Sequence, residues 1–300
     1  MRLAAVISAL LAALPAAAAP LSHPDSVIGI LGRDVTREED TLLDIARAHD
    51  LGYVEILAAN PGVDPWLPGA GITVVLPTQF VLPDTPRQGI VINLPELRLY
   101  YYPRGGAPRS FPLGIGGEGA ETPVGRTQVA RKQTHPTWFP TSSERAENPE
   151  LPTSVPPGPD NPMGDYALYL GWRGYAIHGT NLPYSIGRRD SHGCIRMYPE
   201  DIAWLYAEVA IDTTVTVVDQ PVKFGWLGGM LYLEVHPAQA EVDTIETEGR
   251  RSSTEAAEID DAAVRAAGPD AARLDWYAIH LAAERQTGAP VAILGPAHGD

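Results

Sequence analysis

The sequence predicts a mainly β protein with one packed helix, preceded by a small α/β module. Gly and Pro number 29 each in 300 residues, which favours a loop-rich β protein over a helical bundle. Runs of β-branched and aromatic residues recur from Gly89 onward, whereas helical spacing is confined to short stretches. Hydrophobic residues make up 44% of the chain, which is enough for a core, so a wholly disordered chain is excluded.

Residues 34–78 predict the α/β module. The pattern becomes helical from Thr36, with the acidic residues 38–40 expected in the first turn and an apolar stripe after them. A second helix fits 54–59 and ends at Asn60-Pro61-Gly62. Residues 72–77 predict a closing strand. The segments 40–42, 45–46, 59–61, 67–69 and 74–77 resemble the LysM module, which binds glycan strands of peptidoglycan or chitin. The alternative is a plain α/β cap on the main domain.

Residues 88–222 predict the main domain, after a Pro-rich boundary at 83–86. Strands are expected at 90–94, 97–102, 111–115, 126–130, 166–170 and 215–218. One helix opens at Tyr198-Pro199 and buries a stripe consisting of Ile202, Leu205, Tyr206 and Val209. Between residues 149 and 162, six prolines fall in 14 positions, which predicts a stiff surface loop or lid.

The chain beyond this domain predicts a β extension at 223–239 and an acidic tail at 240–300. Residues 240–270 hold nine acids against three arginines, which is typical of a solvated, mobile segment. One amphipathic helix is expected at 270–288, with Asp270 as its N-cap. Its apolar face would consist of Leu274, Tyr277, Ala278 and Leu281.

Residues 1–19 have the layout of a secretory signal peptide. Arg2 gives a positive start, Leu3–Leu14 an apolar run, and Ala16–Ala19 the small cleavage positions. A membrane anchor is disfavoured because the run is shorter than the roughly 20 residues of a bilayer span. No second apolar segment predicts a transmembrane span. We therefore expect an exported protein.

The charge and the cysteine count narrow the function classes. The formal net charge is -15 at pH 7, which argues against a nucleic-acid binder because such proteins need basic surface to displace counterions from phosphate. Cys194 is the one cysteine, so no intrachain disulfide is possible. This residue is therefore either inert packing or chemistry, and its neighbourhood favours chemistry.

That neighbourhood is the segment His178-Gly179-Thr180-Asn181, followed by Ser191-His192-Gly193-Cys194 and then Arg196. An imidazole within hydrogen-bond reach converts a thiol, whose reference pKa is near 8.5, to a nucleophilic thiolate. Gly193 permits a tight turn that exposes backbone N–H groups to an oxyanion. Arg196 suits a substrate carboxylate. The combination predicts acyl transfer through a thioester. A zinc site from His178, His192 and Cys194 is disfavoured because a fourth ligand is missing.

This pattern strongly resembles the YkuD-type catalytic domain of L,D-transpeptidases. The flanking runs 97–103, 122–125 and 158–164 support the resemblance, which covers residues 88–222 and continues weakly through 231–236. The set is similar to the enterobacterial branch that builds peptidoglycan cross-links or attaches an outer-membrane lipoprotein. The resemblance implies a β-sandwich-like catalytic domain, with neither cofactor nor metal.

The resemblance also implies roles. Cys194 would be the nucleophile and His178 the general base, oriented through the Gly179 carbonyl. His192 and the Gly193–Cys194 backbone would shape the oxyanion pocket, while Ser191 and Arg196 would support loop and substrate. Ser191 and Thr180 have a plain alternative as turn hydroxyls.

The implied function is that of a periplasmic L,D-transpeptidase in cell-wall remodelling. Its partners would be peptidoglycan stem peptides and glycan strands, with an outer-membrane lipoprotein as one candidate acyl acceptor. Cys194 would form a thioester with a tetrapeptide donor, release D-Ala and pass the acyl group to an amine. One alternative is a cysteine L,D-carboxypeptidase, in which water replaces the amine. The other is a non-catalytic peptidoglycan-binding protein.

Overall fold

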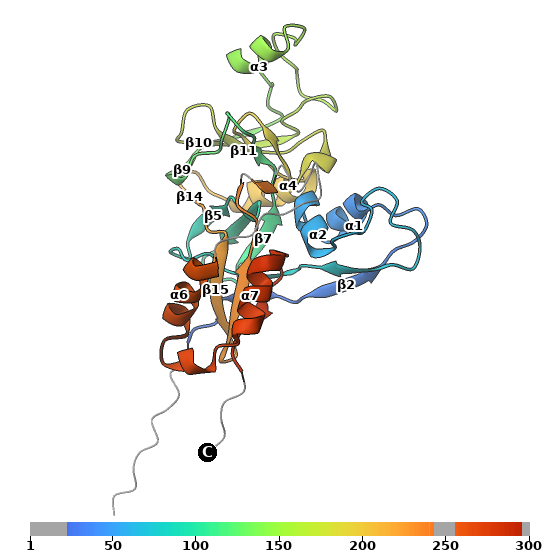
Figure 1. Ribbon diagram of the computed structural model, residues 1–300. Coiled ribbons are helices and arrows are strands. Elements are labelled where there is room, and N and C mark those ends of the chain that lie inside the picture. The colour runs from blue at the N-terminus through green and yellow to red at the C-terminus, as the bar shows by residue number, and fades with distance from the viewer. Residues whose placement is uncertain (1–22, 240, 243–255, 296–300) are drawn as a thin grey trace, which may run out of the picture.

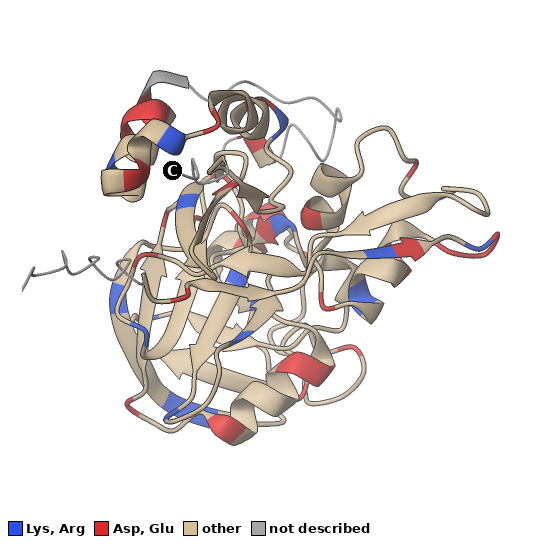
Figure 2. Ribbon diagram, turned by 90° about the horizontal axis from the view of Figure 1, so that it is seen from below, with Lys and Arg blue, Asp and Glu red and all other residues tan. Residues whose placement is uncertain are grey.

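The computed structural model describes residues 23–239, 241–242 and 256–295 of the chain. The predicted signal peptide, residues 1–19, lies outside the described residues. Within the described ranges, no helix is long and apolar enough to cross a membrane. In the view of Figure 2, basic and acidic residues are interspersed along the ribbon, and no continuous basic stripe is visible.

A mixed eight-stranded sheet forms the centre of the molecule, in the order β13-β11-β10-β9-β14-β5-β6-β7 (Figure 1). The strands are β5 (Gly89–Asn93), β6 (Arg98–Tyr102), β7 (Arg109–Pro112), β9 (Gly125–Thr134), β10 (Tyr166–Leu170), β11 (Ala176–His178), β13 (Ile195–Arg196) and β14 (Thr214–Val218). The β14–β5 and β11–β13 pairs are parallel, and the other neighbours are antiparallel. The prediction of a mainly β protein is confirmed.

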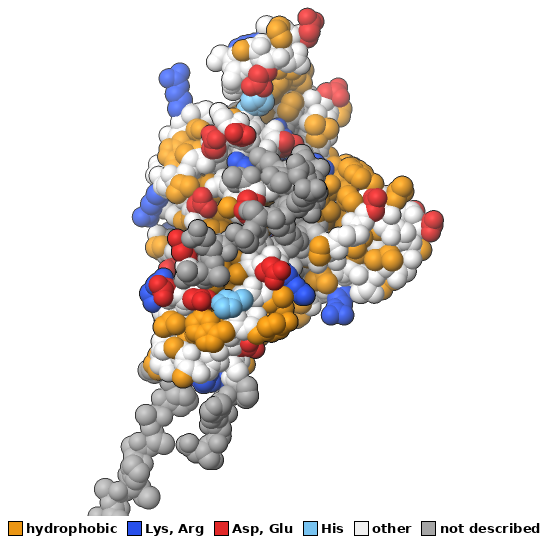
Figure 3. Space-filling model, viewed as in Figure 1, with side chains coloured by type: hydrophobic (Ala, Val, Ile, Leu, Met, Phe, Trp, Pro, Cys, Tyr) orange, Lys and Arg blue, Asp and Glu red, His pale blue; other side chains and the backbone are white. Residues whose placement is uncertain are grey.

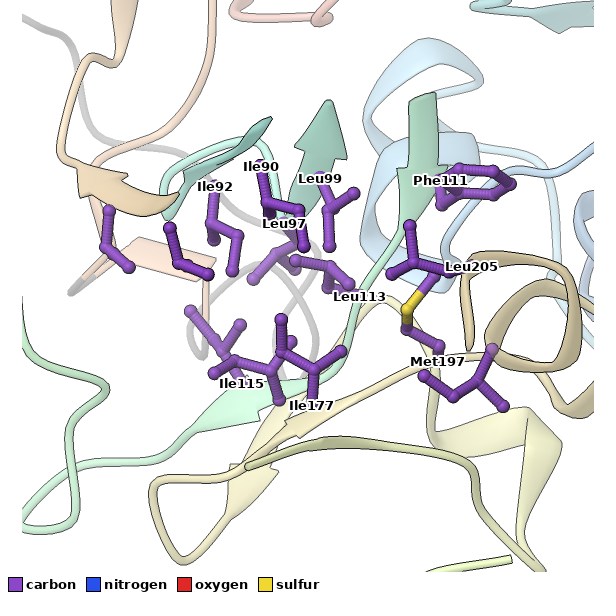
Figure 4. Packing of buried hydrophobic residues seen from close by; sticks show 14 of the residues in the cluster. Ile90, Ile92, Leu97, Leu99, Phe111, Leu113, Ile115, Ile177, Met197 and Leu205 are labelled. Carbon is purple, nitrogen blue, oxygen red and sulfur yellow. The ribbon is translucent and has the colours of Figure 1, made fainter. Parts of the chain in front are cut away.

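The sheet bends at β9 and closes around a core. The first half of β9 pairs with β14 and the second half with β10. Residues from both halves of the sheet, such as Ile90 and Ile177, belong to the same buried cluster, part of which Figure 4 shows. The result is a half-barrel in one curled sheet, rather than the two separate facing sheets that the sandwich-like prediction suggested.

One helix packs its apolar residues into this core. α4 (Pro199–Glu208) buries Ile202 and Leu205, and its C-cap Val209 is buried as well, as predicted. Tyr206, also expected in the stripe, is only partly buried and packs on Lys132. Three short elements complete the domain near its edge: β8 (Ile115–Gly116), β12 (Arg189–Ser191), which pairs with β8 in parallel, and the 3-10 turn η1 (Pro183–Ser185).

The N-terminal module covers the outer face of β5 and β6. It consists of β1 (Val27–Gly29), β2 (Gly32–Val35), α1 (Leu42–Ala48), α2 (Tyr53–Ala59), β3 (Thr73–Leu76) and β4 (Gln79–Val81). Alternate residues of the sheet, including Val91 and Tyr100, share a second core with α1, α2 and β3. Burial on both faces explains why β5 and β6 consist mainly of apolar and aromatic residues, with Asn93 and Arg98 as buried polar exceptions.

The predicted helices of the module are present, with one difference. α1 begins at Leu42, and Thr41 is its N-cap, with Oγ1 accepting a hydrogen bond from the Asp44 N–H at 3.1 Å. The acidic residues 38–40 therefore lie in the preceding loop, not in the first helical turn. A capping hydroxyl at Thr41 defines the helix start more strongly than nearby acids do.

Backbone hydrogen bonds join the module to a loop of the central domain. The first amides of α2 donate to the opposite loop, from Tyr53 to the Ile186 carbonyl at 3.1 Å and from Val54 to the Gly187 carbonyl at 3.2 Å. Gly187 has a φ of +86°, and a Cβ there would lie 2.0 Å from the Tyr53 nitrogen. Only glycine fits this contact.

Residues 256–295 form a packed C-terminal unit instead of the predicted mobile tail. β15 (Val222–Leu227), β16 (Met230–Val235) and β17 (Val291–Ala292) make a three-stranded sheet. The helix α6 (Ala256–Ala267), the 3-10 segment η2 (Gly268–Arg273) and α7 (Trp276–Arg285) accompany it. Their shared core is rich in alanine, for example Ala263 and Ala283, and small side chains of this kind give a weak hydrophobic signal in sequence. Residues 240 and 243–255 of the predicted tail lie outside the described residues.

The helix predicted at 270–288 is the shorter α7, and it buries a different face from the predicted one. Asp275, not Asp270, caps it by accepting a hydrogen bond from the Ala278 N–H at 3.0 Å. Its buried face consists of Ile279 and Ala283, whereas Tyr277 is 77% exposed.

A buried ion-pair network ties the three parts together. The Lys223 ammonium lies 2.7 Å from Glu96 Oε2 and 2.8 Å from Glu234 Oε1, and it donates to the Val81 carbonyl at 2.6 Å. His236 Nε2 also contacts Glu234, at 2.6 Å. These groups come from the module, the central sheet and the C-terminal unit.

Candidate active site

Parallel pairing of β11 and β13 brings Cys194 and His178 to one face of the sheet. Ile177 pairs with Ile195 and His178 with Arg196, so Cys194 falls beside Ala176. Side chains two residues apart on a strand share a face, which puts Cys194, Ala176 and His178 together. From strand spacing and rise, the Cα atoms of Cys194 and His178 are roughly 8 Å apart. Ile177 and Ile195 point the other way, into the core.

His178 is buried and its ring orientation is defined. Its Nδ1 lies 2.6 Å from the Gly179 carbonyl, which only accepts, so Nδ1 carries the proton. Burial lowers the pKa of His178 to about 4, and the Gly179 hydrogen bond opposes that shift. The imidazole is therefore neutral at pH 7, and Nε2 is the nitrogen that can accept a proton.

Cys194 is partly buried in the pocket, and its Sγ has a backbone carbonyl as neighbour. Its Sγ lies 3.6 Å from the Gly174 carbonyl. Burial raises the pKa of the Cys194 thiol above its ordinary value, and the nearby Glu144 charge adds to this; a hydrogen bond from the Ala176 N–H and the Arg196 charge oppose it. The direction of this shift favours a neutral thiol at pH 7, on the same sheet face as a neutral imidazole, and the thiolate stays a prediction for the reacting enzyme.

Side-chain hydroxyls that donate to backbone carbonyls hold the loop that carries the thiol. Ser191 Oγ donates to the Cys194 carbonyl at 2.6 Å, and Thr122 Oγ1 donates to the Gly193 carbonyl at 3.0 Å. Gly193 has a φ of +96°, a left-handed conformation that favours glycine. Thr180 Oγ1 accepts from the Leu182 N–H at 2.9 Å. Both hydroxyls that we considered, Ser191 and Thr180, thus have backbone partners within their turns.

A cavity of about 610 Å³ opens over the Cys194–His178 pair. Its apolar wall includes Trp138, Phe139, Leu151, Met163 and Leu182. Its polar lining includes Glu144, Glu147, Asp190, Ser191, His192 and Arg196. Arg196 donates to Asp190 at 2.9 Å, so its guanidinium reaches the cavity already paired with one carboxylate. The size suits a short peptide segment.

A lid formed by residues 136–163 makes one wall of this cavity. It carries α3 (Ser142–Glu147), which stands on an arm at the top of Figure 1. The Pro-rich part is organised by Asn161, which is fully buried and donates to the Pro136 carbonyl at 2.8 Å and the Pro156 carbonyl at 3.1 Å. The stiff loop predicted at 149–162 is thus part of a lid with a helix in it.

His192 ties the thiol-bearing loop to α3. Its Nε2 lies 2.9 Å from Glu147 Oε2, and its Nδ1 lies 3.5 Å from Glu144 Oε1. Both ring nitrogens therefore face the lid. Glu144 also caps α3, accepting the Thr141 N–H at 2.6 Å. Whether the side chain of His192 takes part in oxyanion binding stays a prediction; its observed contacts are with the lid.

One cluster has the donor types of a metal site. Among the described residues, Glu96, Glu234 and His236 are the only set of three such side chains whose ligand atoms lie within 4.8 Å of one another. Lys223 already places its ammonium between the two carboxylates. The cluster is therefore an ion-pair network. His178, His192 and Cys194 do not converge as a zinc site would require.

Sequence reasoning missed several contributors to the site. Thr122, Glu144 and Glu147 are far from Cys194 in sequence, and Gly174 and Ala176 act only through backbone atoms. The run at 122–125 is one of the flanking motifs of the resemblance, but a single sequence does not show that the Thr122 hydroxyl bonds the Gly193 carbonyl.

A thiol and an imidazole together in a lidded cavity define the class of cysteine-dependent acyl-transfer sites. Residues 87–217 match the YkuD family, the L,D-transpeptidase catalytic domain. The chain belongs to this family, as its similarity to curated members also shows.

Two of these relatives show how far the similarity extends. Probable L,D-transpeptidase ErfK/SrfK of Salmonella typhimurium is 50% identical over 202 residues, which cover 65% of each chain. Probable L,D-transpeptidase YcfS of Escherichia coli is 42% identical over 246 residues, which cover 77% of each. The solved L,D-transpeptidase 3 from Mycobacterium tuberculosis shares 22% identity at a TM-score of 0.36, over 49% of this chain and 67% of that one. The chain thus spans 65% of the length of the first relative.

Proposed function

We propose that this protein is a periplasmic L,D-transpeptidase that acts on peptidoglycan stem peptides. The observation that carries the proposal is the placement of Cys194 and His178 on one face of the sheet, beneath a peptide-sized cavity that both residues line. Family membership and curated relatives named as L,D-transpeptidases support it.

Acylation uses the protonation states described above. Cys194 Sγ attacks the carbonyl carbon of the third residue of a tetrapeptide while its proton passes to His178 Nε2. The oxyanion of the tetrahedral intermediate is held by the backbone N–H groups of Gly193 and Cys194. The C–N bond then breaks, D-Ala leaves with the proton from His178, and a thioester remains on Cys194.

Deacylation repeats the sequence with a second nucleophile. An amine attacks the thioester, His178 takes its proton, and the thiolate leaves and is reprotonated. The acceptor amine comes from a second stem peptide, or from a lysine of an outer-membrane lipoprotein in the alternative acceptor reaction. With water as acceptor the same site would be an L,D-carboxypeptidase. The apolar wall of the lid, including Trp138 and Phe139, favours transfer because it limits water at the thioester.

Incubation with disaccharide tetrapeptide and an amine acceptor tests the proposal. Intact-mass measurement should show an acyl-enzyme on Cys194, and product analysis should show D-Ala with a new amide bond. Cys194→Ala, a small-for-small change, should fold normally and form neither. Release of D-Ala without a transfer product would establish the hydrolase instead. Absence of any acyl-enzyme would favour a non-catalytic wall-binding protein.

We also propose that the N-terminal module is LysM-like and binds glycan strands. It is built as β2-α1-α2-β3, and it exposes large apolar side chains, including Trp66 at 56%, Leu67 at 80% and Val35 at 55%. Hydrophobic side chains, in orange, are visible on the surface of the module at the right of Figure 3. Exposed aromatic side chains of this kind stack well on sugar rings.

Deleting the module is not a clean test, since it shares a core with the catalytic sheet. Trp66→Ala and Leu67→Ser should instead weaken pelleting with sacculi and leave turnover of soluble muropeptides unchanged. Ile211→Ser, at an exposed position of similar character outside the module, is the control. Equal pelleting by all variants would contradict glycan binding at this surface.

A further inference from the structure

Thr122 is buried behind the loop that carries the thiol and does not line the cavity. Its Oγ1 accepts a hydrogen bond from the Gly116 N–H at 3.1 Å and donates one to the Gly193 carbonyl at 3.0 Å. Because an amide only donates through its N–H and a carbonyl only accepts, the hydroxyl proton must point at Gly193. Neither the acylation step nor the deacylation step proposed for Cys194 and His178 uses the Thr122 side chain.

The surroundings leave the Gly193 backbone little room. A Cβ on Gly116 would lie 2.9 Å from the Gly193 Cα, and a Cβ on Gly193 would lie 2.9 Å from the Tyr175 ring. Two glycines thus bring the β8 backbone and the loop into close contact, with the Thr122 hydroxyl bridging them. The Thr122 hydroxyl therefore fixes the direction in which the Gly193 carbonyl points, as well as its distance from β8.

The Gly193 carbonyl and the Cys194 N–H belong to one peptide group. A trans peptide is planar, with its C=O and N–H pointing in opposite directions, and the described residues contain no cis peptide bond. A carbonyl held toward Thr122 therefore turns the Cys194 N–H to the opposite side. Cys194 and His192 line the cavity, whereas Thr122 and Gly116 do not.

We propose that Thr122 is a positioning residue that aims the Cys194 N–H at the oxyanion of the tetrahedral intermediate. The inference rests on the proposed function, since that chemistry creates the oxyanion. Thr122 touches neither substrate nor thiol, and acts through the peptide plane.

The test compares two reactions of the same thiol in the full-length protein. Attack on p-nitrophenyl acetate passes through a tetrahedral oxyanion, while alkylation by iodoacetamide is a displacement that forms none. Thr122→Val keeps the shape and removes the hydroxyl. It should slow acylation by p-nitrophenyl acetate roughly 100-fold, as loss of one oxyanion donor does. Alkylation should stay within about twofold, because thiol reactivity is unchanged.

Two further variants separate positioning from stability. Thr36 is also buried, and its Oγ1 donates to the Gly69 carbonyl at 2.5 Å and accepts from the Ile72 N–H at 3.0 Å, inside the N-terminal module. Thr36→Val breaks the same kinds of bond far from the thiol and should acylate like the wild type. Thr122→Ser keeps the hydroxyl and should restore acylation. Should Thr122→Val fail to fold by circular dichroism, Thr122→Ala takes its place.

The inference is overturned if p-nitrophenyl acetate acylates the Thr122→Val and Thr36→Val proteins at the same rate. It is also overturned if the rates of acylation and of alkylation by iodoacetamide fall by the same factor in Thr122→Val. A parallel assay of the wild type with a tetrapeptide separates the two proposals. A wild type that reacts with the ester but not with the tetrapeptide would refute the stem-peptide function, while the ester series still decides the role of Thr122.

Discussion

At the scale of single residues, the neutral Cys194–His178 pair decides how the thiol should respond to pH. Because burial raises the pKa of the thiol, iodoacetamide reactivity of the wild type should rise with pH only above the ordinary cysteine range. His178→Asn removes the base. We expect acylation to fall by roughly 10²–10⁴-fold while the alkylation profile changes little.

That outcome differs from what an ion pair would give. A thiolate–imidazolium pair would alkylate rapidly near neutral pH, and His178→Asn would move the apparent thiol pKa upward. Rate–pH profiles of the two proteins with iodoacetamide, measured beside acylation rates, distinguish the cases. A marked upward shift in the variant would contradict the neutral pair.

His178 also links stability to pH. Its pKa is about 4 in the folded protein, below the ordinary 6.5, so only the unfolded chain gains a proton between these values. The contribution of His178 to the free energy of unfolding is therefore fully present above pH 6.5. It is lost as the pH falls toward 4, because the unfolded chain takes up a proton that the folded protein does not. At pH 4.5 the loss should be about 2–3 kcal/mol.

Urea unfolding of the wild type and His178→Asn at pH 7.5 and 4.5 checks this. The comparison is necessary because Asp201 acts in the opposite direction: burial raises its pKa to about 7, so its contribution grows as pH falls. That contribution is common to both proteins and cancels in the difference. An equal acid loss in both proteins would contradict the assignment to His178.

At the scale of elements, the contact between His192 and α3 should hold the lid. Glu147 is 66% exposed, so its interaction with His192 is worth at most about 1 kcal/mol. Glu147→Gln should therefore speed hydrogen exchange of the α3 amides by up to about fivefold. Glu150→Gln removes the same charge from the same exposed segment and should leave exchange unchanged. Similar acceleration in both variants would contradict a specific role for the His192 contact.

The elements also show where sequence reasoning succeeds and fails. β5 and β6 were predicted because burial on both faces leaves runs that are mainly apolar and aromatic. α6 was missed because its apolar positions are mostly alanines among acidic residues, so the acidic composition hid its helical stripe, and β17 because a two-residue strand carries little periodic signal. The pair Cys194 and His178 was predicted from the motif, whereas Thr122, Glu144 and Glu147 reach the loop only through tertiary folding.

At the scale of the whole molecule, Lys223 joins the three packed parts. Replacing it by Met would leave Glu96 and Glu234 buried beside each other without their cation. Breaking a buried pair in this way costs roughly 3–5 kcal/mol. We expect Lys223→Met to lose about that much free energy of unfolding in urea.

Arg47→Met is the matched control. Arg47 also bridges two parts, from α1 to Glu200 of α4 at 2.9 Å, but the two side chains are 36% and 49% exposed, whereas Lys223 and its partners are buried. Its loss should cost no more than about 1 kcal/mol. Equal destabilisation by the two substitutions would show that burial of the Lys223 network is not what stabilises the assembly.

The position of β14 in the central sheet has a consequence for biosynthesis. It lies between β9 and β5, yet it is the last of the eight strands to leave the ribosome. Until Thr214–Val218 emerges, β5-β6-β7 and β9-β10-β11-β13 are two fragments, each with an unpaired edge at β5 or β9. Unpaired edges recruit other chains. A nascent chain stalled before Thr214 should therefore depend on chaperones that shield these edges, and release of the full-length chain should end that dependence.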